Sequence, residues 1–270
     1  MTEPFKMTND QSILWIKDWM DKNPGLVAGF TTRYGGVSES NYKSLNTGLH
    51  VGDEQENVLK NRHIISEKLL FPLQSWVLTE QCHGNEVLFV NEQDKGKGTL
   101  TTEDSLRHAD GMITNEPGIL CVTMYADCVP LYFIDSATKT VASVHAGWKG
   151  TVKKIAKQTI QHFIANGSNL KDIQVVIGPC ICKNCYEVGD SVIQHIDDSY
   201  TDAYDRIKQD KYLLDLKKLN KLLLLESGLM EEQIHITKYC TYEDDLFFSH
   251  RRDHQQTGRM IGFIGYRSEE

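Results

Sequence analysis

Three short segments each place a metal-binding side chain at the end of an apolar run. The side chains are His83, Cys128 and His145. One thiolate and two imidazoles suit zinc, and three protein ligands leave a fourth position for water, as in catalytic zinc sites. The ligands are 45 and 17 residues apart, which is no recognised metal-binding spacing. Spacing alone therefore leaves open that Cys128 is an ordinary core residue, because cysteine is among the most buried residue types.

A second group of cysteines follows the Gly178-Pro179 pair. Cys180, Cys182 and Cys185 lie within six residues of one another. Structural zinc sites are usually built from two close pairs of ligands, and the sequence shows no obvious partner pair. We therefore interpret these residues as unpaired thiols in a loop.

Two further segments carry groups suited to anions. Residues 145–151 have the pattern of a strand, a glycine turn and a helix start, where free backbone N–H groups and Lys149 suit phosphate. An ordinary strand-to-helix turn explains this pattern equally well. Residues 247–259 form a polar, basic segment in which Arg251 suits a carboxylate or a phosphate, with surface ion pairing as the alternative.

The elements that must position these residues mix strands and helices without strict alternation. Apolar runs predict strands at residues 26–32, 76–79, 87–91, 119–125, 129–134, 141–145, 175–177, 234–239 and 260–266. Helical spacing predicts helices at residues 57–70, 151–165 and 213–226, with Gly228 capping the last. This order predicts the α/β (α+β) class: one domain over residues 1–270, with a layered mixed β-sheet and flanking helices. No dinucleotide-binding or P-loop signature occurs.

Composition and charge disfavour several classes of protein. Lys and Arg number 29 against 37 Asp and Glu, and the resulting net charge of −8 disfavours nucleic acid as a partner. Seven cysteines, an odd number, fit a reducing compartment better than a disulfide framework. The N-terminus lacks the pattern of a secretory signal, and the longest apolar stretch, residues 119–126, is too short to span a bilayer. We expect a cytoplasmic protein without a membrane partner, of unspecified oligomeric state.

Taken together, the motifs resemble those of the YfiH/YlmD family, also called laccase-domain or multicopper polyphenol oxidase proteins. The resemblance runs through nearly the whole chain and implies a YfiH-like fold. It is carried by Thr31-Thr-Arg33-Tyr-Gly-Gly-Val-Ser38, Ser44-Leu-Asn46-Thr-Gly48, Gln81-Cys-His83-Gly84, Ala109-Asp110-Gly111, Ala126-Asp127-Cys128-Val-Pro130, His145-Ala-Gly-Trp-Lys-Gly150, Gly178-Pro179, Tyr186-Glu-Val-Gly189 and Phe248-Ser-His-Arg-Arg-Asp253. The cysteine-rich stretch between Gly178 and Tyr186 departs from the family pattern.

The resemblance implies a zinc enzyme of purine nucleoside chemistry. It implies that His83, Cys128 and His145 hold Zn²⁺ and that the substrates are a purine nucleoside and phosphate. The implied reactions are phosphorolysis of adenosine and inosine and deamination of adenosine, and related members are implied to use methylthioadenosine.

Four other residues are expected to serve this chemistry. Arg33 and Asn46 lie in matching pocket motifs and are expected to bind substrate. Arg251, with Arg33, is expected to hold phosphate through its guanidinium group. Asp127, beside Cys128, is expected to act as a catalytic acid or base, or to orient a metal ligand.

Three alternatives stay open at this point. A copper oxidase is disfavoured, because the ten histidines include no His-x-His pair and the three-ligand set suits zinc. A cysteine hydrolase, of the peptidoglycan-editing type, would use Cys128 as nucleophile and His145 as base. A protein stabilised by zinc that only binds a partner would need a fourth protein ligand, for which Cys82 is the nearest candidate.

Overall fold

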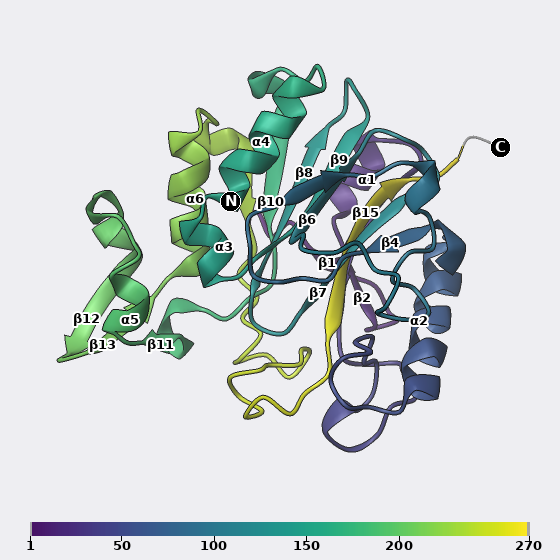
Figure 1. Cartoon of the computed structure of the whole chain (residues 1–270), viewed down its shortest axis with the longest axis horizontal. Coiled ribbons are helices and arrows are strands. Elements are labelled where there is room, and N and C mark those ends of the chain that lie inside the picture. Colours follow the sequence, from purple (N-terminus) through teal and green to yellow (C-terminus); the bar gives the residue numbers. More distant parts are fainter. Residues whose placement is uncertain (1, 269–270) are drawn as a thin grey trace.

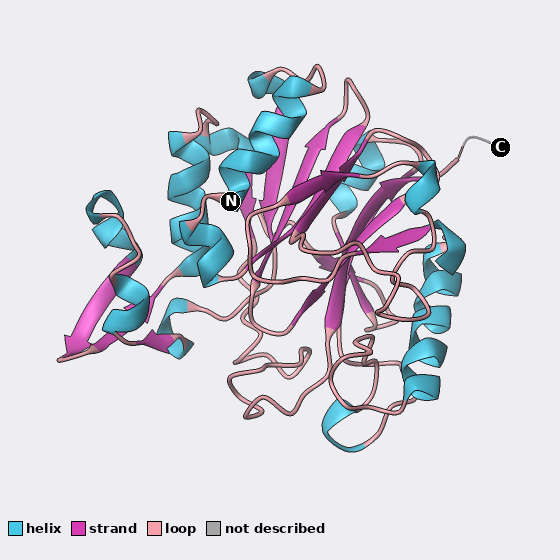
Figure 2. Cartoon of the chain, in the orientation of Figure 1, coloured by secondary structure: helices cyan, strands magenta, loops and turns pink. Residues whose placement is uncertain are grey.

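Two six-stranded sheets pack against each other, and helices cover the outer face of each sheet (Figures 1 and 2). This arrangement is seen in a computed structural model that describes residues 2–268. The predicted class, a mixed α+β protein with layered sheets and flanking helices, is confirmed. The assignment of residues 1–270 to a single domain stays a prediction.

The first sheet has the strand order β1-β2-β3-β15-β7-β4. Its central strand is β15, the last of the chain, which pairs antiparallel with β3 on one side and with β7 on the other. This pairing brings the segment before β15, which carries the basic residues, to the end of β7, where Cys128 follows. The strands are β1 (Lys6–Met7), β2 (Ile13–Trp15), β3 (Leu26–Thr31), β4 (Trp76–Leu78), β7 (Leu120–Tyr125) and β15 (Met260–Tyr266).

The second sheet has the order β14-β10-β8-β9-β6-β5. Its strand β8 is buried on both faces: Leu131 and Phe133 point to the helices, while Tyr132 and Ile134 point to the first sheet. This alternation explains why β8 reads as a continuous apolar run. The strands are β5 (Val87–Phe89), β6 (Gly111–Thr114), β8 (Val129–Asp135), β9 (Thr140–Ala146), β10 (Ile173–Ile177) and β14 (Ile234–Ile236).

Helix α2 (Gln55–Leu69) packs on the first sheet, and α3 (Trp148–Val152), α4 (Ile155–Ala165) and α6 (Leu216–Glu226) pack on the second. All three predicted helices have different bounds, although α2 differs from its prediction by only one or two residues at each end. The helix predicted at 151–165 starts earlier and is broken at Lys154, whose backbone is left-handed with φ 62°. The helix predicted at 213–226 starts at Leu216, because Asp215 accepts a hydrogen bond from the Lys218 N–H and caps it.

A small third sheet, absent from the predicted elements, extends from the main body beside α6 (Figure 1). Its strands have the order β11-β13-β12. The remaining elements are β11 (Glu187–Val188), β12 (Tyr204–Lys208), β13 (Lys211–Leu214), α1 (Lys17–Lys22) and α5 (Asp190–Ile193). Among the described residues, no helix is both long enough and apolar enough to cross a membrane.

Candidate active site

His83, Cys128 and His145 come together where the two sheets meet. His83 lies in the loop after β4, Cys128 in the tight connection between β7 and β8, and His145 near the end of β9. Their potential ligand atoms all lie within 4.8 Å of one another. The β8–β9 pairing sets His145 opposite Pro130, two residues after Cys128, so the hairpin register determines this approach. These three side chains form what we call the pocket cluster.

The backbone is strained on two sides of the pocket cluster. His83 has φ 58° and Asp127 has φ 88°, values in the left-handed region that residues with a Cβ seldom adopt. Such conformations persist only where surrounding contacts enforce them, and they concentrate at functional sites. Here the enforcing contacts are made by two buried carboxylates, those of Asp110 and Asp127.

Asp110 connects two members of the pocket cluster. Its Oδ1 lies 2.8 Å from His145 Nδ1, and its carboxylate accepts hydrogen bonds from the His83 N–H at 2.9 Å and the Gly84 N–H at 2.6 Å. Burial favours the protonated carboxyl, but the hydrogen bonds from His145 and Gly84 outweigh burial and lower the Asp110 pKa to about 2. Asp110 therefore occupies Nδ1 of His145 and leaves Nε2 as the nitrogen for a metal.

The pocket cluster also favours an ionised thiol. Burial opposes ionisation of Cys128, but the nearby His145 and His83 outweigh it and lower the Cys128 pKa to about 6. Burial likewise disfavours a charged His145, but Cys128 and Asp110 together raise its pKa to about 9. A thiolate beside a histidine held by a carboxylate is a group ready either to bind a cation or to act as a nucleophile.

The donor set fits zinc. It consists of one thiolate and two imidazoles, and the Nε2 of His83 lies 4.0 Å from Cys128 Sγ. Asp110 supplies the carboxylate partner that metal-bound histidines usually have. Gly147 leaves room for the side chains of His83 and Cys128. A Cβ at this position would lie 2.9 Å from a His83 ring carbon and 3.2 Å from Cys128 Sγ.

Two cavities meet at the pocket cluster, and both are lined by His83, Cys128 and His250. The larger, of about 810 Å³, continues past His145 toward Arg259 and His50. The smaller, of about 320 Å³, is lined in addition by Trp148, Lys149, Tyr186 and Arg251. Because the cavities share one border, molecules held in each would approach the same two potential ligands, His83 and Cys128.

Asp127 holds the wall of the smaller cavity in place. Its buried carboxylate accepts hydrogen bonds from the Thr241 and Ser249 hydroxyls and from the Arg251 N–H, at 2.6, 3.0 and 2.7 Å. The Arg251 guanidinium lies over the Tyr186 ring, 5.1 Å from its centroid. These contacts make Asp127 an anchor for the loop that carries Arg251, while an acid or base role for Asp127 stays a prediction.

Arg33 and Asn46 line neither of these two cavities. Arg33 donates a hydrogen bond to the Lys43 carbonyl and lies over the Phe248 ring. Asn46 is buried, and its Oδ1 accepts a hydrogen bond from the Arg259 N–H at 2.8 Å, so it positions a residue of the larger cavity. Direct binding of substrate by Arg33 or Asn46 stays a prediction.

Several site residues received no role from the sequence alone. Asp110 supports two ligands, and His50, His250 and Arg259 line the larger cavity. The signal for Asp110 is its place directly before β6, since β6 pairs with β9 and sets Gly111 opposite Val144. That register places Asp110 beside His145.

Comparison with known proteins identifies the family of this chain. The family model described as "Multi-copper polyphenol oxidoreductase laccase" matches residues 27–267. The protein "Purine nucleoside phosphorylase YlmD" of Bacillus subtilis is 44% identical over 270 residues, covering 97% of each chain.

Solved structures share the fold of this chain. The crystal structure of YlmD from Geobacillus stearothermophilus superposes with a TM-score of 0.94 at 37% identity, covering 99% of this chain and 100% of that chain. The crystal structure of the Bacillus licheniformis protein YfiH gives the same TM-score at 39% identity, covering 98% and 100%. The chain therefore belongs to the YfiH/YlmD family, whose family model carries the laccase description.

Proposed function

We propose that this protein is a zinc-dependent purine nucleoside phosphorylase acting on adenosine and inosine, with adenosine deamination as a second reaction. The observation that carries the proposal is the meeting of two cavities at one potential metal site. Phosphorolysis joins two substrates, a nucleoside and phosphate, at a single carbon atom, and so needs two binding spaces with a common border. The name of the Bacillus subtilis relative supports this choice of reaction.

We assign the nucleoside to the larger cavity and phosphate to the smaller. A volume of about 810 Å³ is within the range of small-molecule sites, whereas about 320 Å³ is near its lower limit. The smaller cavity has Lys149 and Arg251 in its wall, and both can carry the positive charge that phosphate needs. Methylthioadenosine, whose 5′ position carries an apolar group, belongs to the same proposal for the larger cavity.

In phosphorolysis a phosphate oxygen forms a bond to C1′ of the ribose while the bond from C1′ to the purine nitrogen breaks. The electron pair of the broken bond passes to the purine, which takes up a proton. His250 borders both cavities, and burial, aided by Arg259, lowers its pKa, so at neutral pH it presents an uncharged imidazole that orients substrates by hydrogen bonds. Zinc held by His83, Cys128 and His145 would supply Lewis acid chemistry at the shared border.

Product analysis tests the proposal directly. Zinc-loaded protein is incubated with adenosine or inosine, with and without phosphate, and the products are separated by liquid chromatography. Free base and ribose 1-phosphate that appear only with phosphate, and are lost in His83→Ala, support the phosphorylase; inosine formed from adenosine supports deamination. An Arg251→Ala variant should raise KM for phosphate roughly 10-fold and change KM for the nucleoside little. Unchanged nucleosides in every condition would refute the proposal.

One observation favours a second candidate function, a cysteine hydrolase. The lowered pKa of Cys128, beside a His145 that Asp110 orients, matches the arrangement of an activated nucleophile. The two candidates differ in their need for metal. A hydrolase would keep its activity after chelation, whereas the phosphorylase would lose activity on chelation and recover it when zinc is added back.

A further inference from the structure

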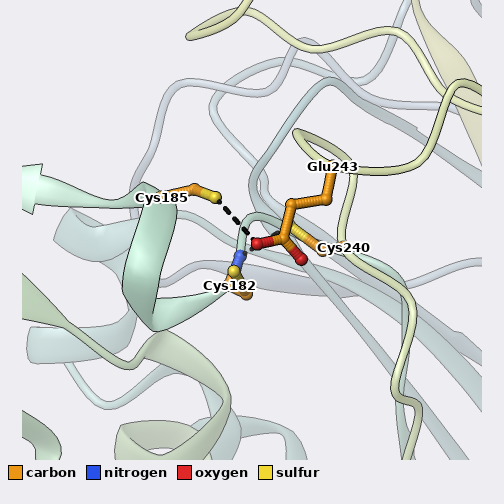
Figure 3. A group of neighbouring side chains, drawn as sticks. All are labelled: Cys182, Cys185, Cys240 and Glu243. Atoms are coloured by element: carbon orange, nitrogen blue, oxygen red, sulfur yellow. Dashed lines mark hydrogen bonds between the residues drawn. The ribbon is translucent and has the colours of Figure 1, made fainter.

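A second group of metal-binding side chains lies apart from the pocket cluster. Cys182, Cys185, Cys240 and Glu243 each offer one atom, and these four atoms all lie within 4.8 Å of one another (Figure 3). The three cysteines are free thiols. We call this group the loop cluster, because all four residues lie in connections after strands of the second sheet.

The fold brings the loop cluster together from distant parts of the chain. Strands β10 and β14 run parallel, and Ile177 pairs with Ile236 near their ends. The chain continues side by side beyond both strands, as the parallel bridge between Cys180 and Cys240 shows. The cysteine-rich loop after β10 therefore meets the segment after β14, about 60 residues further along the chain.

The spacing within each segment is that of a zinc site. Cys182 and Cys185 have two residues between them, and so do Cys240 and Glu243. The first pair has the spacing that structural zinc sites use, and the second adds a thiolate and a carboxylate, which is also a zinc ligand. The sequence alone shows no partner pair for these cysteines, because the neighbouring pair contains a glutamate and lies far away in the sequence.

Hydrogen bonds already support the arrangement. The Cys182 N–H donates to Cys240 Sγ at 3.2 Å, and Cys185 Sγ lies 3.4 Å from Glu243 Oε1 (Figure 3). A backbone N–H aimed at a sulfur stabilises a thiolate, as is common around metal-bound cysteines. Lys183, the cation within the loop, forms an ion pair with Asp205 at 2.5 Å instead of neutralising the cluster. A divalent cation would compensate the negative charge that the ionised cluster carries.

We propose that the loop cluster binds a structural Zn²⁺ ion through Cys182, Cys185, Cys240 and Glu243. Three soft thiolates and one carboxylate complete a tetrahedral set and leave no position for a substrate. Each thiol gives up its proton to solvent when it binds the ion. The site is distinct from the pocket cluster, since the two share no residue.

The ion would join two segments that form the wall of the smaller cavity. Tyr186 directly follows Cys185, and the segment that begins at Cys240 leads to Arg251, whose guanidinium lies over the Tyr186 ring. Within this second segment the Arg252 guanidinium donates to the carbonyls of Thr241 and Phe247, which holds the segment compact. A metal at its start therefore fixes the position of the whole segment relative to Tyr186.

Zinc content of the purified protein tests the proposal. The zinc content is measured by elemental mass spectrometry. The parent chain should hold about two zinc ions, and Cys185→Ser or Cys182→Ser should each hold about one. Asn184→Ser, an exposed position between the two cysteines, is the matched control and should keep both ions. His83→Ala should lose the other ion, and the double variant with Cys185→Ser should lose both. Equal zinc content in the parent and in Cys185→Ser would overturn the proposal.

A second measurement needs no variant. X-ray absorption at the zinc edge should give about two sulfur ligands per zinc on average at a Zn–S distance of about 2.3 Å, because one site supplies one thiolate and the other three. If only the pocket cluster binds zinc, the average falls to about one. A disulfide between two loop cysteines would also overturn the proposal, and would appear as a loss of two hydrogens in the mass of the unreduced protein.

Discussion

The pocket cluster and the loop cluster use similar side chains in opposite settings. In the pocket cluster three potential ligands line the larger cavity, two of them also line the smaller one, and Asp110 holds His83 and His145 by hydrogen bonds. In the loop cluster four potential ligands face one another, and hydrogen bonds from the Cys182 N–H and the Cys185 thiol join them. An incomplete ligand set beside open space suits chemistry, whereas a complete set between two loops suits stability.

Removing zinc from the whole protein would change activity and stability together, whereas changes in one cluster at a time should affect them separately. The ligands of the pocket cluster are positioned by sheet register and by a buried carboxylate, so the fold can hold them without the ion. The loop cluster joins two segments that lie beyond the ends of their strands, and a bound ion would link them directly. We therefore expect changes in the pocket cluster to affect activity and changes in the loop cluster to affect stability.

The largest expected effect is on the rate of the reaction. Replacing Cys128 with Ser removes the thiolate ligand, and we expect kcat/KM for inosine to fall by about 1000-fold or more. Replacing Cys185 with Ser should lower it less than about 5-fold at a temperature where both proteins are folded. Steady-state kinetics on both variants, with Asn184→Ser as control, measures the difference. Similar losses in the two cysteine variants would remove the distinction between the clusters.

Thermal stability should show the reverse order. Loss of a structural metal belongs to the few single-site changes with large effects, and we expect Cys182→Ser to lower the free energy of unfolding by about 3 kcal/mol, or Tm by roughly 6–12 °C. His83→Ala should lower Tm by less than about 3 °C. Differential scanning calorimetry of zinc-loaded proteins provides the comparison, and a larger shift in His83→Ala would contradict it.

Asp110 should affect both the affinity for zinc and the stability of the fold at low pH. Since outer carboxylates support metal-bound histidines, Asp110→Asn should weaken zinc binding about 10- to 100-fold. The Asp110 pKa is about 2 in the folded protein, below its ordinary value, so the ionised carboxylate stabilises the fold above about pH 4. That contribution, about 2 kcal/mol, is lost as the pH falls from about 4 to 2.

Denaturant titrations across this pH range separate the two effects of Asp110. The parent should lose stability between pH 4 and 2 more steeply than Asp110→Asn, because the unfolded chain binds a proton that the folded parent does not. Parallel curves for the two proteins would show that the hydrogen bonds of Asp110 do not set its pKa. Glu103→Gln, which removes a carboxylate from the wall of the larger cavity, serves as the control.

The smallest expected effect concerns thiol reactivity in zinc-depleted protein. The Cys128 pKa is lowered to about 6, so its alkylation by iodoacetamide should rise through about pH 6 and level off above it. Burial and Asp110 raise the pKa of Cys82 above its ordinary value, so Cys82 should react only under more alkaline conditions. Peptide mass spectrometry resolves the two positions, and of these two cysteines zinc should protect Cys128 and not Cys82. Equal pH profiles would contradict the assignment of an ionised Cys128.

Most of the core elements were predictable from the sequence because their apolar runs reflect burial on both faces, as in β8 and β15. The small third sheet was not, since β12 is largely exposed and carries no such pattern. The sequence named the three members of the pocket cluster as candidate ligands, but it did not show that they lie close together, because that depends on strand register. Register also decides the position of Asp110, and a single sequence does not specify which strands pair.

The loop cluster was missed for a related reason. Its two halves meet only because β10 and β14 are parallel neighbours, a long-range pairing that leaves no local mark in the sequence. In addition, the second pair is Cys240 with Glu243, and a cysteine followed three residues later by a glutamate is no recognised zinc motif.

Gly147 limits how this protein can be redesigned. Because a single methyl group there would press on His83 and Cys128, the floor of the site does not tolerate a larger side chain. New nucleoside preferences must therefore come from the wall of the larger cavity, for example through His50, Met124 or His250. Directed evolution for an altered nucleoside should accordingly randomise those wall positions and keep the glycine fixed.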